Sequence, residues 1–314
     1  MKLLGLHHVT AICSDAQKNA DFYSGVLGLR VTKVTVNFDD PQSYHLYYGN
    51  ADGSPGTNIT FFVWPGGRRG RIGPSQVATT AYSIERASLD FWQQRFADRG
   101  VACSEIGVKF GEPFFRVEDP DGMVIELVGV DGELPPGYET SGIEPQHTLR
   151  AFHSVTLLER VLDATAEAVT KHMDFVEHST EGDVIRYAID GGGPGKWIDV
   201  HFDATKPAGH QGAGIVHHVA FRTPDDASEK QWQERLHDAG LHVSPQMERT
   251  YFRSIYFREP GGVLFEIATD GPGFAVDEEG GIGRSLRIPP WYEEQRAAIL
   301  AGLPKFKAAG IEYP

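Results

Sequence analysis

Histidine pairs occur in two apolar, strand-like runs, LHHVT at 6–10 and VHHVA at 216–220. A carboxylate, Glu266, interrupts a third apolar run, VLFEIA. Burying such a carboxylate is costly unless a cation or hydrogen bonds compensate. Two imidazoles and one carboxylate form the ligand set of non-heme Fe(II) sites that keep open positions for oxygen chemistry. We therefore predict that His8, His218 and Glu266 hold Fe(II), with Mn(II) or another divalent metal as alternatives.

Strand geometry selects the second histidine of each pair. Adjacent side chains of a strand point to opposite faces, so only one histidine of a pair easily enters a given cavity. His8 shares its face with the polar Thr10, whereas His217 shares its face with Val219, on what resembles a helix-packed side. His7 and His217 therefore need a β-bulge or an indirect role to act at the metal. The competing interpretation is that these residues are ordinary hydrogen-bonded core groups.

Four segments of the chain, called modules one to four, repeat one order of elements: a short strand, a helix, then further strands. Apolar residues recur every three or four positions in each helical stretch, and glycine closes three of them. Helices are expected over residues 16–29, 87–100, 162–173 and 226–240. The closing strands DPDGMVIEL and EPGGVLFEI place Glu126 of module two opposite Glu266 of module four.

The histidine positions divide the modules into two kinds. Superposing the module openings places Ser154 of module three opposite His8, and Thr79 of module two opposite His218. One pair of modules can therefore bind a metal, whereas the other pair keeps only Glu126. A shared site for the two histidines requires module one to pack beside module four.

The repeats predict an α+β fold in which four βαβββ modules form two curled mixed sheets with helices outside. We expect an N-terminal domain over 1–131, a C-terminal domain over 149–270 and a tail over 271–314. A Pro- and Gly-rich linker separates the domains, and the tail contains one helix that starts near Pro290. The short motif DVHFD at 199–203 is expected to form surface ion pairs.

Composition excludes several function classes. The formal net charge of −14 argues against nucleic acid and anionic membranes as partners. No apolar run approaches the about 18 residues of a membrane span. The two cysteines form no C-x-x-C motif, which fits a reducing compartment. These features predict a cytoplasmic protein.

The strands LHHVT, DPDGMVIEL and EPGGVLFEIA resemble the opening- and closing-strand signatures of the vicinal oxygen chelate superfamily, which includes glyoxalases, bleomycin resistance proteins and extradiol dioxygenases. Within it, the chain resembles the hydroquinone-type ring-cleaving dioxygenases. The stretches that carry this narrower resemblance are FFVWPGGRRGRIG, QMERTYFRSIYFREPGGVLFEIATDGPGFAVDE and IPPWYEEQR.

The resemblance implies an Fe(II)-dependent enzyme that inserts O2 into a hydroquinone or related phenolic ring. A small aromatic molecule and O2 would be its partners. It implies that Arg249 and Tyr256 polarise the substrate oxygen or stabilise developing charge, and that His217 moves protons. His7 and Thr10 would contact or orient substrate and oxygen around the metal.

Other functions stay open at this point. A catechol extradiol dioxygenase would bind two vicinal hydroxyl groups at the metal. A glyoxalase-like isomerase or transferase would add a fourth protein ligand from NITFFVW in module one, which has no carboxylate. A non-catalytic binding protein of the same fold would lack the three ligands. The sequence also leaves homo-oligomerisation open.

Overall fold

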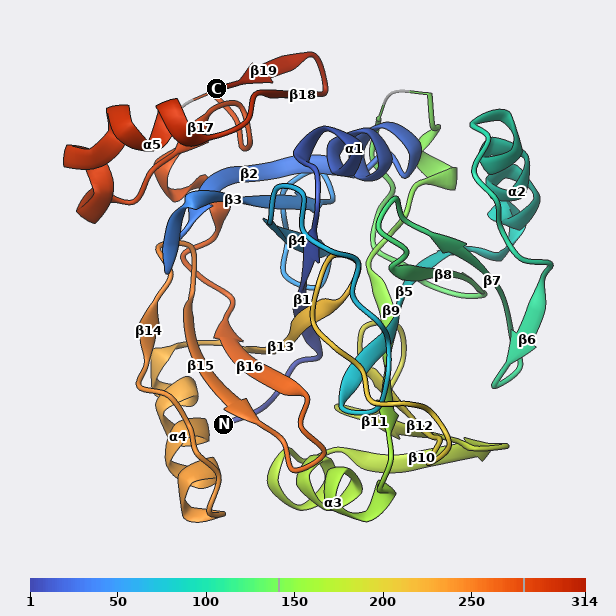
Figure 1. Cartoon of the computed structure of the whole chain (residues 1–314). Helices are drawn as coiled ribbons and strands as arrows, with labels where there is room; N and C mark the ends of the chain where they lie inside the picture. The colour runs from blue at the N-terminus through green and yellow to red at the C-terminus, as the bar shows by residue number, and fades with distance from the viewer. Residues whose placement is uncertain (141, 279) are drawn as a thin grey trace.

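The computed structural model describes residues 1–140, 142–278 and 280–314. Its strands form two large mixed sheets, of nine and eight strands, and a separate two-stranded hairpin. Both large sheets curl, and the helices lie on the outside of them (Figure 1). The predicted α+β architecture of two curled sheets with outer helices is confirmed.

The nine-stranded sheet takes its strands from both ends of the chain. In sheet order they are β14 (Met247–Glu248), β15 (Arg253–Arg258), β16 (Leu264–Thr269), β13 (Val216–Thr223), β1 (Leu6–Cys13), β4 (Asn58–Val63), β3 (Asp40–Gly49), β2 (Arg30–Asn37) and β17 (Leu286–Arg287). At its centre β1 runs antiparallel to β13. Module one therefore packs beside module four, as the shared metal site requires.

The eight-stranded sheet is built in the same way from modules two and three. In sheet order its strands are β10 (Val176–Glu181), β11 (Val184–Ala188), β12 (Trp197–Phe202), β9 (Phe152–Glu159), β5 (Gln76–Glu85), β8 (Val124–Val130), β7 (Glu112–Glu118) and β6 (Gly107–Lys109). Each sheet thus combines strands from both of the ranges 1–131 and 149–270. The division of the chain into domains at these bounds stays a prediction.

Helices follow the first strand of each module where the repeat predicts them. They are α1 (Ala16–Ala20), which continues as a π-helical segment (Asp21–Val26), α2 (Leu89–Asp98), preceded by a 3-10 turn (Arg86–Ser88), α3 (Leu162–Glu167), which continues as a π-helical segment (Ala168–His172), and α4 (Asp226–Asp238). Aspartates at the N-caps fix two of these starts, because Asp15 and Asp225 accept hydrogen bonds from backbone N–H groups three residues later. Trp92 of α2 and Trp232 of α4 are fully buried in the core between helices and sheets.

The tail adds more than the one expected helix. Its elements are a 3-10 turn (Phe274–Asp277), β17, a 3-10 segment (Pro290–Gln295), α5 (Arg296–Gly302) and the hairpin of β18 (Phe306–Ala308) and β19 (Ile311–Tyr313). In Figure 1 this red segment lies along β2 at the outer edge of the nine-stranded sheet. Two ion pairs hold the tail against β2. The fully buried Lys33 of β2 has its Nζ 2.6 Å from Asp277 and 2.7 Å from Glu278.

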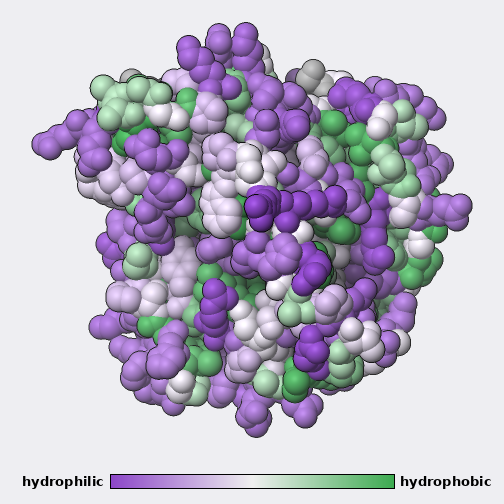
Figure 2. Space-filling model, in the orientation of Figure 1, coloured by the Kyte–Doolittle hydropathy of each residue, from purple (hydrophilic) through white to green (hydrophobic). Residues whose placement is uncertain are grey.

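The outer surface is mostly hydrophilic on the face shown in Figure 2, where apolar residues form small separate areas. Over the described residues, no helix combines the length and the apolar character that a membrane crossing requires.

One expectation about surface residues is wrong. Asp199 of the DVHFD motif is fully buried, and Arg186 donates to both of its carboxylate oxygens at 2.7 and 3.0 Å. The side-chain alternation of β12 turns Asp199 to the inner face of the eight-stranded sheet. The motif contributes a core ion pair.

Candidate metal centre

β-Bulges on the two central strands decide where the four histidines point. The register between β1 and β13 slips by one residue at His7 and again at His217. Each of these residues is the extra residue of a bulge, where the regular alternation of faces is interrupted. His217 therefore lines the same cavity as His218, although strict alternation places it on the opposite face. His7 is buried behind His8.

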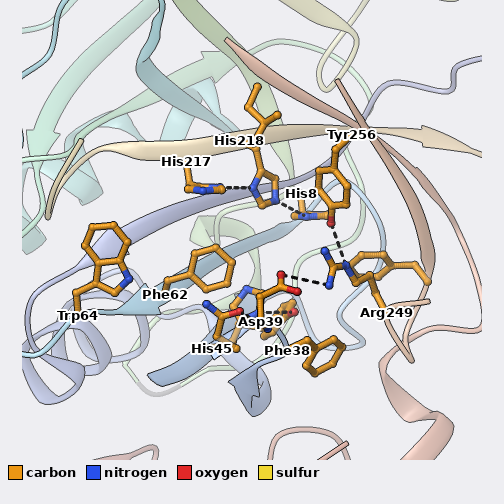
Figure 3. A pocket seen from close by; sticks show the side chains of 14 residues that line it. His8, Phe38, Asp39, His45, Phe62, Trp64, His217, His218, Arg249 and Tyr256 are labelled. Atoms are coloured by element: carbon orange, nitrogen blue, oxygen red, sulfur yellow. Dashed lines mark hydrogen bonds and ion pairs between the residues drawn. The ribbon is translucent and has the colours of Figure 1, made fainter. Parts of the chain in front are cut away.

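The side chains of His8, His218 and Glu266 converge on one point (Figure 3 shows the two histidines). The Nε2 atoms of the histidines are 3.4 Å apart, and they lie 3.2 and 2.9 Å from Glu266 Oε2. Ligand atoms about 2.1 Å from an ion and at right angles to one another are about 3.0 Å apart. The three atoms therefore have the spacing of one face of a metal coordination shell.

The carboxylate of Glu266 is prepared to bind a cation. Its Oε1 accepts a short hydrogen bond from Ser254 Oγ. Its Oε2 is fully buried and has no hydrogen-bond partner among the described residues, although both imidazoles are close. A buried carboxylate oxygen without a partner is costly unless a cation compensates it. The residues present thus fit a divalent metal.

The preceding histidine fixes the tautomer of His8. His7 Nε2 lies 3.2 Å from Thr269 O, which can only accept, so Nε2 carries the proton. His7 Nδ1 then accepts from His8 Nδ1 at 2.8 Å, and this leaves a lone pair on His8 Nε2. The same 2.8 Å contact joins His217 Nδ1 to His218 Nδ1. Outer partners of this kind orient metal-binding imidazoles.

Burial sets the charge of these groups. Desolvation, followed by the neighbouring His8, lowers the pKa of His7 well below its ordinary value, and desolvation also lowers the pKa of His218. Both imidazoles are therefore neutral, the form that binds metals.

A cavity of about 330 Å³ opens beside the two histidines. Aromatic side chains form much of its wall, and polar groups gather at one side (Figure 3). The aromatic lining residues are Phe38, Tyr47, Phe62, Trp64, Phe252 and Tyr256. The cavity has the size and the apolar character of a small-molecule site.

Arg249 and Tyr256 form the polar side of this cavity. Arg249 Nε donates to Tyr256 OH at 3.3 Å, and Nη1 lies 3.5 Å from Asp39 Oδ2. Burial, followed by the charge of Glu266, raises the pKa of Tyr256, so its hydroxyl stays protonated. Since the guanidinium occupies a lone pair of the hydroxyl oxygen, the hydroxyl group donates its own proton to another acceptor.

The predicted site residues occupy two shells around this point. His8, His217, His218, Arg249 and Tyr256 line the cavity. His7, Thr10 and Glu266 are buried behind the lining residues. The functional roles assigned to all of them stay predictions.

Sequence reasoning did not find His45 and Tyr47, which lie on β3 of module one. Tyr47 pairs with Thr60 across its sheet as Tyr256 pairs with Glu266, so the two tyrosines are equivalent in the repeat. A comparison of the repeats that included these outer strands would have identified Tyr47. His45 accepts or donates at both ring nitrogens, 2.9 Å from Tyr47 OH and 2.8 Å from Thr60 Oγ1. Thr10, 2.7 Å from Thr60 Oγ1, reaches the cavity only through this chain.

Two ranges of the chain match one known protein family. Residues 5–127 and 150–267 match the family model of the Glyoxalase/Bleomycin resistance protein/Dioxygenase superfamily. The chain belongs to this superfamily. The crystal structure of glyoxalase I from Zea mays superposes with a TM-score of 0.64 over 85% of this chain and 92% of that one. Its 13% identity supports the shared fold alone.

Two superfamily relatives match almost the whole chain. The Bacillus subtilis protein named "Putative ring-cleaving dioxygenase MhqO" is 41% identical over 99% of both chains. The Sphingobium indicum "Chlorohydroquinone/hydroquinone 1,2-dioxygenase" is 32% identical over 94% of both. A crystal structure of "putative dioxygenase from Bacillus subtilis" superposes with a TM-score of 0.94, at 41% identity and 99% coverage of both chains. These relatives agree with the resemblance to ring-cleaving dioxygenases.

Proposed function

We propose that this protein is an Fe(II)-dependent dioxygenase that cleaves the ring of a hydroquinone or related phenol. The observation that carries the proposal is Glu266 Oε2, which has no hydrogen-bond partner within the described part of the chain and faces two histidine Nε2 atoms beside an aromatic-walled cavity. The names of the two relatives reported above support the same reaction class.

In this proposal His8, His218 and Glu266 hold the metal on one side. The chemistry that bound Fe(II) supplies is activation of O2 together with electron transfer from the coordinated ring. His7, His217 and Ser254 hold the three ligands in position, because each occupies the second polar atom of one ligand. Such partners tune both ligand orientation and metal affinity.

The polar side of the cavity would bind the oxygen atoms of the ring. Tyr256 donates its hydroxyl proton to a substrate oxygen, and Arg249 stabilises negative charge that develops there. With the metal on His218 Nε2, His218 Nδ1 carries the proton and donates to His217 Nδ1. The neutral ring of His217 then holds its proton at Nε2 and can donate it within the cavity. The aromatic walls exclude water from the ring.

The fourth protein ligand of a glyoxalase-type site is missing here. Ala220 pairs with Glu266 on β16, and the equivalent Thr10 pairs with Thr60 on β4. Thr60 therefore stands where a second carboxylate would stand, and its hydroxyl is bonded to Thr10 and His45. Three protein ligands leave positions for substrate and oxygen, which favours the dioxygenase over the isomerase.

The test is anaerobic reconstitution with Fe(II), followed by oxygen-electrode assays with hydroquinone and with catechol. We expect oxygen uptake with hydroquinone, and a ring-opened product that carries both atoms of ¹⁸O-labelled O2. Protein loaded with Zn(II) is the control, because Zn(II) has no redox chemistry. Oxygen uptake with catechol but not with hydroquinone would show that the protein is a catechol extradiol dioxygenase instead. No uptake with either compound would refute the dioxygenase.

A further inference from the structure

We propose that Asp39 makes the cavity selective for uncharged aromatic rings, by setting a carboxylate at its mouth and neutralising Arg249. The inference rests on the proposed function only in taking an aromatic ring as the ligand. It names the substrate class more narrowly, as phenols without an anionic substituent.

Asp39 lies where solvent enters the cavity. It occupies the tight turn between β2 and β3, where its backbone N–H donates to Asn37 Oδ1 at 3.0 Å. Its side chain lines the cavity and is 71% exposed, whereas that of Arg249, facing it from module four, is 16% exposed. The pair therefore links the turn of module one to module four at the cavity, as the dashed line in Figure 3 marks.

The tail holds this turn in place. Tyr292 OH donates to Phe38 O at 2.9 Å, and the ring of Trp291 packs edge-on against Phe38 with centroids 5.4 Å apart. The residue next to Phe38 is Asp39 itself. The carboxylate is thus presented at the mouth by packed side chains from another part of the chain.

The charges lining the cavity explain the selectivity. Of the described lining residues, Arg249 is the one with a permanent positive charge and Asp39 the one carboxylate. Without Asp39 the mouth would carry a net positive charge and would attract anionic rings. With Asp39, a carboxylated ring must compete for Arg249 and then lie close to a second carboxylate. At 3.5 Å, with one partner exposed, the ion pair is weak, so an uncharged hydroxyl replaces it at little cost.

The test compares two ligands that differ in charge and hardly in shape, 2,5-dihydroxybenzamide and 2,5-dihydroxybenzoate. Their Kd values are measured anaerobically at pH 8 on metal-loaded protein, from quenching of tryptophan fluorescence, since Trp64 lines the cavity. We expect wild type to bind the amide more tightly. In Asp39→Asn the ratio of the two Kd values should move toward the carboxylate by about fivefold, and less at high salt.

Asp40→Asn is the matched control, because it removes the same charge from an adjacent exposed residue that does not line the cavity. Its Kd ratio should equal that of wild type. The inference is overturned if Asp39→Asn leaves the ratio within twofold of wild type, if Asp40→Asn shifts it equally, or if neither compound binds. Oxygen uptake with hydroquinone is measured on the same samples. A shifted Kd ratio without uptake supports the selectivity and refutes the dioxygenase.

Discussion

Equivalent strand positions carry different residues in the two large sheets. In the nine-stranded sheet, Thr10 pairs with Thr60 and Ala220 pairs with Glu266 across neighbouring strands. The equivalent cross-strand pairs of the eight-stranded sheet are Thr156 with Asp199 and Ala81 with Glu126. The nine-stranded sheet thus has two histidines and one carboxylate around its centre. The eight-stranded sheet has two carboxylates there, while Ser154 and Thr79 occupy the histidine positions.

Side chains from the chain itself compensate the carboxylates of the eight-stranded sheet. Lys109 Nζ lies 2.8 Å from Glu126 and 3.3 Å from Asp199. Arg116 and Arg186 complete the cluster and donate to the same two carboxylates. A lysine ammonium bridges two acids at the place that corresponds to the metal centre.

The neighbouring strands decide between these two outcomes. Arg116 and Arg186 occupy the positions that Tyr256 and Tyr47 occupy in the other sheet. The arginines fill the centre of their sheet with internal ion pairs. The tyrosines stand at the cavity wall and bring no charge to the carboxylate, so Glu266 keeps an unpartnered oxygen. The same fold is therefore either closed by ion pairs or open to a cation.

The largest expected effect comes from removing a ligand. His218→Ala should reduce metal affinity by more than about 100-fold, beyond the 10–100-fold typical of outer residues. Thr79→Ala, at the equivalent position of the eight-stranded sheet, should leave metal content unchanged. Metal analysis after dialysis measures both variants. Equal metal content in His218→Ala and wild type would contradict the ligand assignment.

Lys109→Met should destabilise the eight-stranded sheet without affecting the metal. It leaves Glu126 and Asp199 with one cation fewer, and breaking a buried pair of this kind costs about 3 kcal/mol. Urea unfolding measures the loss. Lys171→Met, which removes an exposed helical ion pair, is the control and should change little. Loss of bound metal in Lys109→Met would show that the two sheets are not independent.

His7→Phe tests whether the bulge histidine orients its neighbour. Without an acceptor for His8 Nδ1–H, metal affinity should fall by about 10–100-fold, while the protein stays folded. Competition titration with a chromophoric chelator gives the affinity. The equivalent residue His153, which contacts Ser154 and Glu112, supplies the control His153→Phe, with unchanged affinity. A similar loss in both variants would indicate a packing effect.

The equivalent strands β9 and β1 end in different residues. β9 ends in Glu159, whereas β1 ends in Cys13. Burial, followed by the nearby Glu259, raises the pKa of Glu159 to about 8. The contribution of Glu159 to the free energy of unfolding is therefore fully present below the ordinary pKa of a glutamate, where its carboxyl is protonated. This contribution is lost as the pH rises through 8 and the buried carboxyl ionises.

Glu159→Gln should therefore match wild-type stability near pH 4 and exceed it at pH 9, by about 1 kcal/mol or more. Thermal unfolding at both pH values measures the difference. Glu177→Gln, at an exposed site, should show no such crossover. Equal stabilities at pH 9 would mean that Glu159 ionises without penalty.

The sequence alone was enough to identify the three residues that the structure brings together at the centre of the site. Repeats reveal the four modules, and a second histidine in only two of their openings selects His8 and His218, with Glu266 on the closing strand of module four. These inferences depend on residue identity and on position within a repeat, both of which are local in the chain. The α+β fold follows for the same reason.

Tertiary structure decided what surrounds that centre. The two bulges turn His217 into the cavity and keep His7 behind it, because a slip in strand register depends on the partner strand and leaves no periodic pattern. The burial of Asp199 and the meeting of Asp39 with Arg249 likewise join residues far apart in the sequence. Residue types fix which groups can bind a metal or carry a charge. Only strand pairing fixes which of those groups face one another.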